Sequence, residues 1–237
     1  MKILTIIIPV KNEGKNIKLL LKSLKETLGK LGVTHEIIVI DGNSDDDTVS
    51  QARGLAQRVL IQNKPGYGNA LKEGFSIAEG QYILTMDGDL SHPTEFIQSM
   101  YQKRKEAELI IASRYVKGGQ ASMPLWRRIL SHILNKAFAV ILSLPIKDIS
   151  SGFRLYQVKA LSKLTLKNQD FSILEEIAIK MWNRGDRIKE IPFYYKPRIH
   201  GRSKVKLLIF GKSYLTTIYS MWKLKHSGRS VKSRKQF

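Results

Sequence analysis

Two aspartates one residue apart are the residues of this sequence best suited to chemistry. Asp87 and Asp89 flank Gly88 directly after an apolar, β-branched run, Tyr82–Met86. Gly88 would let the backbone bend, so that both carboxylates reach one side of a tight turn. Such a pair suits a hard cation, Mg²⁺ or Mn²⁺, that the phosphates of a nucleotide also bind. Surface turns favour the same residues, but the place of this turn between a buried run and a helix beginning at Pro93 favours the metal site.

Other polar residues follow other apolar runs. Asp41 ends the run Glu36–Ile40, and its carboxylate could accept hydrogen bonds from a base or from ribose hydroxyls. A turn that enters a helix is the alternative interpretation of Asp41. Asn12 and Glu13 follow Pro9 and could add a polar edge to the same site.

A glycine-rich turn offers a third candidate. Gly66 and Gly68 surround Tyr67, and Asn69 follows. Two glycines expose bare backbone, which could approach a nucleotide, so Gly66 and Asn69 are candidate substrate contacts. The turn lacks the spacing of a Walker phosphate loop and is therefore a weak motif on its own.

The hydrophobic pattern predicts the elements that must position these residues. Continuous apolar runs predict buried strands at Ile3–Ile8, Glu36–Ile40, Val59–Ile61, Tyr82–Met86 and Leu109–Ala112. Helical spacing predicts helices over Ile17–Leu28, Val49–Leu55, Asn69–Ala78 and Pro93–Lys105. This alternation is typical of an α/β fold with a mainly parallel sheet flanked by helices. Because parallel strands end at one edge, Pro9, Asp41 and Asp87 should meet in one crevice.

The ordered motifs resemble glycosyltransferase family 2, whose members have the Rossmann-like GT-A fold. In the first half these motifs are Pro9–Glu13, Asp41–Asp45, Lys64–Ala70 and Asp87–Pro93. In the second half, four motifs resemble dolichyl-phosphate mannose synthases and their polyprenyl-phosphate relatives: Ser113–Gly119, Asp148–Tyr156, Glu190–Pro192 and Arg198–Lys204. The resemblance covers residues 3–205, and it implies inverting transfer of a sugar from a nucleotide diphosphate to a polyprenyl or dolichyl phosphate.

Carried over by position, the resemblance assigns roles to individual residues. The implied metal ligands are Asp87, Asp89 and Ser91, where some relatives have Gln at the third position. The nucleoside pocket would be lined by Pro9, Glu13 and Asp41, and the donor diphosphate would be reached by Arg198 and Lys204. The acceptor phosphate would face Arg114, Arg127 and Ser131, which with Asp89 form the catalytic set. Asp87 and Gly88 would also contact the donor. Many relatives read Asp-Asp-Gly-Ser where this chain has Asp41-Gly42-Asn43-Ser44.

The chemistry of direct displacement fits these roles. The leaving diphosphate gains charge, which a metal ion with Arg198 and Lys204 would stabilise. A phosphate acceptor is already anionic and needs positioning cations rather than a general base. A family 2 enzyme that glycosylates a saccharide hydroxyl is the alternative; it needs a base, for which Asp148 and Glu175 are candidates. For the donor, GDP-mannose is favoured by the second-half motifs, and UDP-glucose is the main rival.

Charge and composition bear on partners. The 237 residues carry a net charge of +20, and residues 191–237 hold 12 of the 40 Lys and Arg with no Asp or Glu. A basic end of this kind attracts anionic lipid, nucleic acid or phosphorylated substrate, or it simply remains solvated. A nucleic-acid-binding protein is disfavoured because no recognition fold emerges.

The absence of cysteine excludes disulfides and thiolate metal sites. It is compatible with the reducing cytoplasm, and the short apolar start predicts no signal peptide.

Two apolar segments favour attachment to a membrane surface. Pro124–Leu144 has the pattern of an amphipathic helix with basic residues on its polar face, although an ordinary helix that covers the sheet has the same periodicity. Leu207–Leu224 is rich in aromatic residues and precedes six Lys and Arg in residues 223–237. We therefore predict a catalytic domain over 1–205 and an amphipathic, basic segment over 206–237 that lies on an anionic membrane at its cytoplasmic face, with a membrane protein as a possible partner.

Overall fold

The first apolar run forms the strand around which the sheet is built. The computed structural model describes residues 2–197, except the side chains of Arg127 and Phe138. Strand β1 (Leu4–Val10) leads into helix α1 (Gly14–Leu31), which ends at Gly32 in a left-handed conformation with φ of 65°. The next elements are β2 (His35–Asp41), α2 (Thr48–Ala52), β3 (Arg58–Ile61), α3 (Tyr67–Ile77), β4 (Tyr82–Thr85), α4 (Phe96–Gln102) and β5 (Leu109–Ser113).

The second half adds elements at the far side of the sheet. In chain order they are β6 (Gln120–Ala121), α5 (Leu125–Leu142), β7 (Arg154–Gln157), α6 (Val158–Leu161), α7 (Ile173–Arg184), β8 (Ile188–Pro192) and β9 (Tyr194–Tyr195). Every predicted strand and helix of the first 112 residues is confirmed. Helix α4 is shorter than predicted because Pro93 and Thr94 make only turn hydrogen bonds, to the amides of Phe96 and Ile97.

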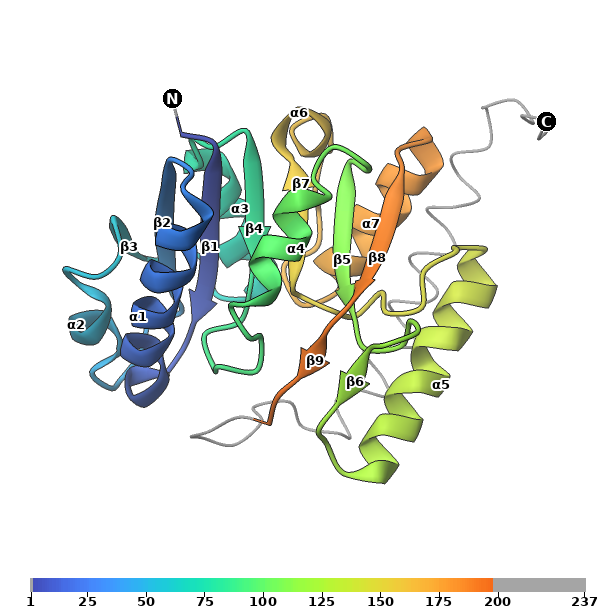
Figure 1. Cartoon of the computed structure of the whole chain (residues 1–237), viewed down its shortest axis with the longest axis horizontal. Helices are drawn as coiled ribbons and strands as arrows, with labels where there is room; N and C mark the ends of the chain where they lie inside the picture. The colour runs from blue at the N-terminus through green and yellow to red at the C-terminus, as the bar shows by residue number, and fades with distance from the viewer. Residues whose placement is uncertain (1, 198–237) are drawn as a thin grey trace.

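The sheet has seven strands in the order β3-β2-β1-β4-β7-β5-β8. All neighbours are parallel except β7, which runs antiparallel to both β4 and β5. The predicted mainly parallel α/β fold is therefore confirmed, with one reversed strand in its middle. That strand brings the loop before Arg154 to the edge where β1, β2, β4 and β5 end (Figure 1).

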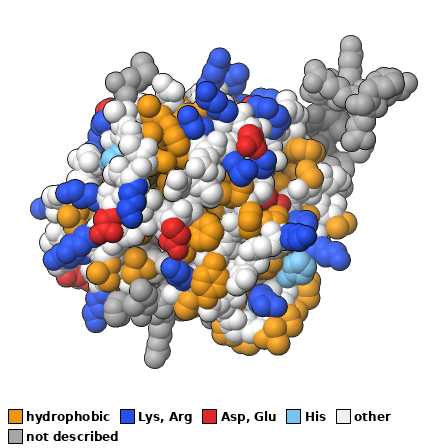
Figure 2. Space-filling model, in the orientation of Figure 1, with side chains coloured by type: hydrophobic (Ala, Val, Ile, Leu, Met, Phe, Trp, Pro, Cys, Tyr) orange, Lys and Arg blue, Asp and Glu red, His pale blue; other side chains and the backbone are white. Residues whose placement is uncertain are grey.

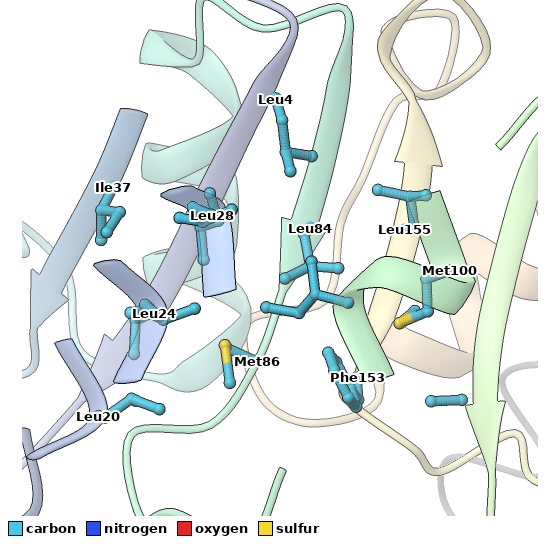
Figure 3. Close-up of a cluster of buried hydrophobic side chains, with 14 of the residues drawn as sticks. Leu4, Leu20, Leu24, Leu28, Ile37, Leu84, Met86, Met100, Phe153 and Leu155 are labelled. Atoms are coloured by element: carbon cyan, nitrogen blue, oxygen red, sulfur yellow. The ribbon is translucent and has the colours of Figure 1, made fainter. Parts of the chain in front are cut away.

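Helices cover both faces of the sheet, which explains why its strands are continuously apolar. On one face, Leu24 and Leu28 of α1 and Met100 of α4 belong to the same buried cluster as Leu84 and Phe153 (Figure 3). On the other face, α3, α6 and α7 pack against a second cluster that includes Ile7 and Ile38. The alternation of β1 between the two clusters fixes its register, because a one-residue slip would exchange the two sets.

Helix α5 lies apart from the two helix layers. Figure 1 shows it beside β6, beyond the edge at which the parallel strands end. Strands β6 and β9 pair there in a small parallel sheet of their own. Within residues 2–197, no helix combines the length and the apolarity needed to cross a membrane. The predicted segment Leu207–Leu224 lies outside the described residues.

Candidate active site

The Asp87–Asp89 turn follows β4 at the carboxyl edge of the sheet. Asp89 is only 2% exposed, and its Oδ1 accepts hydrogen bonds from the backbone N–H of Ser91 (3.0 Å) and from the Ser91 hydroxyl (2.5 Å). The Asp87 side chain is 32% exposed. Asp89 is thus held by hydrogen bonds to Ser91, while Asp87 is partly exposed to solvent. The Ser91 hydroxyl is used to hold Asp89, which favours a positioning role for Ser91 over the predicted role as a metal ligand.

Gly88 is required by packing rather than by the bend expected from the sequence. A Cβ at Gly88 would lie 2.5 Å from Cγ1 of Val10, so any larger residue would push β1 and the turn apart. The residue with left-handed backbone in this turn is Leu90, whose φ is 65°. A non-glycine residue in that region costs about 1–2 kcal/mol, and such strain is typical of functional turns.

His92 holds the backbone of Asp87 and was not singled out from the sequence. Its Nδ1 accepts the N–H of Asp87 (3.0 Å), and its Nε2 lies 3.7 Å from Asp87 Oδ2. The ring is 3% exposed and stacks on Phe153, with Phe193 and Tyr195 at its edges. Because Nδ1 accepts, the neutral ring carries its proton on Nε2, toward the carboxylate. Its only sequence signal was its place within the motif Asp87–Pro93.

The loops after β1 and β2 are bonded to each other. Asp41 is 1% exposed, and its two oxygens accept the Ser44 hydroxyl (2.5 Å) and the Ser44 N–H (2.8 Å). Ser44 Oγ also accepts the N–H of Asn12, and Asn12 Oδ1 accepts the N–H of Asp45. Asp41 thus shapes a turn, as in the alternative interpretation, with its carboxylate at the strand end where a nucleoside contact was predicted.

The unusual order of glycine and asparagine in this loop has a conformational reason. Asn43 has a φ of 61° and occupies the position where many relatives have glycine, and asparagine tolerates left-handed backbone better than most residues. Gly42 lies close to β1, since a Cβ there would come within 3.1 Å of the Val10 carbonyl oxygen. The departure therefore preserves the turn.

Glu13 and Pro9 lie on the same rim. The Glu13 N–H donates to the Thr48 hydroxyl (2.7 Å), and Glu13 Oε2 accepts the side-chain amide of Asn16 (2.7 Å). Pro9 is partly buried near the end of β1. Their positions at the carboxyl edge agree with the predicted pocket, and their contacts with a nucleoside stay a prediction.

The glycine-rich turn contacts protein backbone. A Cβ at Gly66 would lie 2.3 Å from the carbonyl oxygen of Gln169, and the N–H of Gly68 donates to that same oxygen at 2.8 Å. The Asn69 side-chain amide donates to the Pro65 carbonyl. The close approach inferred from the glycines is therefore to the loop before α7. The nucleotide contacts predicted for Gly66 and Asn69 gain no support from these distances.

Tyr67 enters the site from this turn. Its ring stacks on Phe171 at a centroid distance of 4.2 Å. A Cβ at Gly152 would lie 2.8 Å from the Tyr67 hydroxyl and 3.4 Å from Asp87 Oδ1, so glycine is needed between the two groups. Burial, followed by the nearby Asp87 charge, raises the pKa of Tyr67 well above its ordinary value. Tyr67 thus stays neutral beside the paired aspartates.

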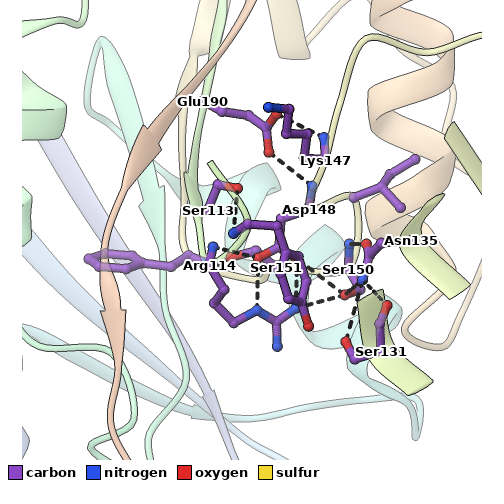
Figure 4. A network of polar contacts seen from close by, with 12 residues as sticks. Ser113, Arg114, Ser131, Asn135, Lys147, Asp148, Ser150, Ser151 and Glu190 are labelled. Carbon is purple, nitrogen blue, oxygen red and sulfur yellow. Dashed lines mark hydrogen bonds and ion pairs between the residues drawn. The ribbon is translucent and has the colours of Figure 1, made fainter. Parts of the chain in front are cut away.

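Arg114 forms a buried ion pair with Asp148 (Figure 4). Its Nε and Nη2 donate to the two carboxylate oxygens at 2.7 and 2.6 Å, and its backbone N–H donates to Asp148 as well. Burial acts to lower the pKa of Arg114, but the adjacent carboxylate outweighs it and the net shift is upward. The amides of Lys147 and Asp148 donate in turn to Glu190. Asp148 thus orients a cation at the site.

Helix α5 brings Ser131 toward this ion pair. Asn135 donates to Ser131 and to Ser150, and Ser150 Oγ accepts from Arg114 (Figure 4). Arg127 lies one helical turn before Ser131, but its side chain is outside the description. Arg198 and Lys204 are not among the described residues, although Lys196 donates its N–H to the carbonyl of Ser91 beside the paired aspartates.

Glu175 is a buried carboxyl group with a raised pKa. It lies in the first turn of α7 and is 6% exposed, and burial raises its pKa to about 7, against a smaller opposing effect of Arg154. Arg154 is fully buried and donates to the carbonyls of Ile149, Ser151 and Leu174. A carboxyl group with this pKa can exchange a proton near neutrality.

The chain matches the model of a known protein family over more than half of its length. The model described as glycosyl transferase family 2 matches residues 5–165, which include the loops at the ends of β1, β2 and β4 and the Arg114–Asp148 pair. The chain belongs to glycosyl transferase family 2.

Curated relatives of this family 2 glycosyltransferase cover nearly all of it. Dolichol-phosphate mannosyltransferase of Pyrococcus furiosus is 33% identical over 92% of this chain, and that of Saccharomyces cerevisiae is 29% identical over 91%. The chain spans 63% of the length of the first relative and 86% of the second.

Solved structures agree with the GT-A fold of this glycosyltransferase. Glucosyl-3-phosphoglycerate synthase of Mycobacterium tuberculosis, in complex with phosphoglyceric acid, matches with a TM-score of 0.76 and 18% identity over 94% of this chain and 80% of that one. The same enzyme with Mn²⁺, uridine diphosphate and glucosyl-3-phosphoglycerate matches with a TM-score of 0.74 and 17% identity, over the same shares of the two chains.

Proposed function

We propose that this glycosyltransferase transfers a hexose, with inversion, from a nucleoside diphosphate sugar to a polyprenyl phosphate. The observation that carries the proposal is the pairing of Arg114 with Asp148 at the edge where the Asp87–Asp89 turn lies. Such an arrangement offers a cation for the acceptor and two carboxylates for a metal ion. Asp148, which could have served as a base, is committed to Arg114. The names of the two dolichol-phosphate mannosyltransferases support the same acceptor class.

The donor side fits a divalent cation. Within residues 2–197, no three His, Asp or Glu side chains gather in a way that could hold a metal by themselves. Asp87 and Asp89 would therefore supply two hard oxygen ligands, with the donor diphosphate and water completing the shell. When bound, Mg²⁺ or Mn²⁺ neutralises charge on the leaving diphosphate. Structures of glucosyl-3-phosphoglycerate synthase with uridine diphosphate contain either Mn²⁺ or Mg²⁺, which supports this class of ion.

The remaining roles follow from charge. Arg114, with Arg127 and Ser131 of α5, would position the acceptor phosphate, and Arg198 and Lys204 would contact the donor diphosphate. Pro9, Asn12, Glu13 and Asp41 would line the nucleoside pocket. GDP-mannose is the favoured donor because both curated relatives are named mannosyltransferases. UDP-glucose is the rival.

Glu175 favours a second candidate, transfer to a saccharide hydroxyl. That reaction needs a general base, and a buried carboxyl group with a pKa of about 7 has the proton affinity for it. If a saccharide is the acceptor, Glu175→Gln should remove most activity. If a polyprenyl phosphate is the acceptor, turnover should change little, because the nucleophile is already anionic.

A membrane surface would deliver the lipid acceptor. Seven apolar side chains of α5 are exposed: Leu125, Trp126, Ile129, Leu130, Ile133, Val140 and Ile141. Figure 2 shows apolar side chains gathered over this region, with basic residues nearby. We propose that α5 and the basic segment 206–237 lie on an anionic bilayer at its cytoplasmic face, with 1–205 as the catalytic domain and a membrane protein as a possible further partner.

Transfer of radiolabel tests the proposal directly. GDP-mannose and UDP-glucose are each incubated with a short polyprenyl phosphate and Mn²⁺. We expect metal-dependent label in the lipid phase from one donor. If a donor is hydrolysed but no lipid is labelled, the donor site stands and the acceptor assignment is wrong.

A further inference from the structure

Helix α5 is joined to the rest of the chain in an unusual way. Helices on globular proteins usually attach through an apolar stripe, but the apolar side chains of α5 are mostly exposed. Of its described side chains, only Asn135 and Leu142 are buried. Leu142 is the last residue of the helix, so Asn135 is the buried contact of its middle. A polar residue thus holds the segment that carries Arg127 and Ser131.

The Asn135 side chain binds Ser150 with both ends of its amide. Asn135 is 2% exposed, its Oδ1 accepts the N–H of Ser150 at 3.2 Å, and its Nδ2 donates to Ser150 Oγ at 3.1 Å. Nδ2 also donates to the carbonyl of Ser131 at 2.8 Å, one turn earlier in α5. The orientation of the amide is determined by the Ser150 N–H, which can only donate. Together with the His132–Tyr115 ring contact and the buried Leu142, this contact constrains the distance and the rotation of α5.

Ser150 connects this contact to the cation of the site. Its Oγ accepts from Arg114 Nη2 at 2.9 Å and lies 3.3 Å from Asp148 Oδ1, to which it donates (Figure 4). Ser150 is therefore shared between α5 and the Arg114–Asp148 pair. A shift of α5 would alter the distance from Ser131 to Arg114, and with it the geometry offered to a phosphate held between them.

We propose that Asn135 is a positioning residue of the acceptor site, which holds the face of α5 with Arg127 and Ser131 in register with Arg114. The inference rests on the proposed function, because it concerns the acceptor phosphate. It predicts different effects on the two substrates. Loss of the Asn135 contact weakens use of the acceptor, and the donor site at the ends of β1, β2 and β4 stays intact.

Asn135→Leu tests this in the full-length protein, since leucine keeps the bulk and removes the hydrogen bonds. We expect KM for a short polyprenyl phosphate to rise about tenfold, as for the loss of one or two buried hydrogen bonds. KM for the nucleotide sugar and the Kd of the nucleoside diphosphate with Mn²⁺, measured by calorimetry, should stay within about twofold of wild type. Amide hydrogen exchange across 125–142 should accelerate. Gln102→Ala, an exposed change in α4, serves as the control.

Other outcomes overturn the inference. An acceptor KM that stays within twofold of wild type removes the positioning role, and equal loss for both substrates with a lower Tm makes Asn135 merely structural. Should Asn135→Leu fail to fold, Ser150→Ala removes the hydroxyl that Asn135 Nδ2 and Arg114 share and keeps the backbone hydrogen bond; an unchanged acceptor KM there also overturns the inference. If the wild-type enzyme labels no lipid, the proposed function itself fails, and the acceptor role of Asn135 falls with it.

Discussion

At the scale of single residues, the site is built from carboxyl groups in very different environments. Asp87 is partly exposed, Asp89 accepts hydrogen bonds from Ser91, and Asp148 pairs with Arg114. Glu175 is buried near Arg154 without forming a comparable ion pair with it, so its pKa rises. Burial and hydrogen bonding thus give these carboxyl groups different environments.

Asp89→Ala tests the metal site. We expect Mn²⁺-dependent turnover to fall by at least about a hundredfold, because the proposed metal site would lose its buried carboxylate ligand. Mn²⁺ binding in the presence of nucleoside diphosphate should weaken in parallel, while the circular dichroism spectrum is retained. Asp186→Ala, a change at an aspartate paired with Arg184, is the matched control. Near-normal turnover of Asp89→Ala would refute the site.

His92 should act through Asp87. His92→Phe keeps an aromatic ring against Phe153 but removes the acceptor for the Asp87 N–H. We expect Mn²⁺ to bind about tenfold more weakly, since residues that orient metal ligands contribute on this scale. Electron paramagnetic resonance titration of Mn²⁺ measures this, and His92→Gln should recover part of the loss. Unchanged Mn²⁺ affinity in His92→Phe would contradict the role.

Glu175 makes stability depend on pH. Its folded pKa, about 7, lies above the ordinary value of 4.5, so the folded protein retains a proton that the unfolded chain releases. The bound proton contributes up to about 3 kcal/mol to the free energy of unfolding. This contribution is complete below about pH 4.5 and is lost as the pH rises through 7. The side chain of Glu175→Gln stays neutral, so the Tm of this variant should rise relative to that of wild type between pH 5 and pH 8. A constant difference in Tm would show that the Glu175 pKa is not raised.

At the scale of elements, the two faces of α5 differ in polarity and exposure. Asn135 contacts the loop that carries Asp148 and Ser150, whereas the apolar side chains of α5 are mostly exposed. The sequence pattern allowed either a helix that covers the sheet or one that lies on a membrane. The observed exposure is the opposite of what a sheet-covering helix requires. The position of α5 beyond the sheet edge agrees with the proposal that its exposed face contacts a bilayer and that Ser131 faces the acceptor.

Ile129 and Ile133 test the outer face of α5. They are 51% and 57% exposed, so changing both to serine should leave the Tm nearly unchanged. Binding to anionic vesicles, measured by flotation, should fall several-fold as buried apolar area is lost. Turnover in detergent should be retained. A large fall in Tm with normal flotation would instead mean that this face packs on protein.

At the scale of the whole molecule, the basic residues are concentrated toward the C-terminal end of the chain, where acidic residues are absent. Residues 191–237 carry 12 Lys and Arg and no acidic residue, and the carboxylates of the candidate site all precede them. A basic end on a protein with a net charge of +20 would orient it on an anionic surface. The proposed membrane contact therefore combines an apolar helix with long-range attraction.

Deletion of residues 223–237 tests the electrostatic part. Six Lys and Arg are removed, so binding to anionic vesicles should weaken and become less sensitive to salt. Turnover in detergent should fall much less than vesicle binding. Neutral vesicles provide the control, and equal binding of the two proteins to anionic vesicles would rule out this contribution.

Much of the fold was determined by local sequence. The runs Ile3–Ile8 and Tyr82–Met86 predicted buried strands because strands covered on both faces need apolar residues throughout. The polar residues that follow them predicted the edge where the site lies. No local pattern predicted that antiparallel β7 lies between β4 and β5, because strand order depends on which distant segments pair.

The sequence by itself determined the residue types, the strand ends that carry them and the family resemblance. Only the tertiary structure decided their partners. It placed Arg114 on Asp148, 34 residues away, and Gly66 against the backbone of Gln169. It also brought His92 within hydrogen-bond distance of the Asp87 backbone and buried Asn135 in the middle of α5. The physical reason is that hydrophobic periodicity is local, whereas hydrogen-bond and ion-pair partners are chosen among groups that only the packed chain brings within reach.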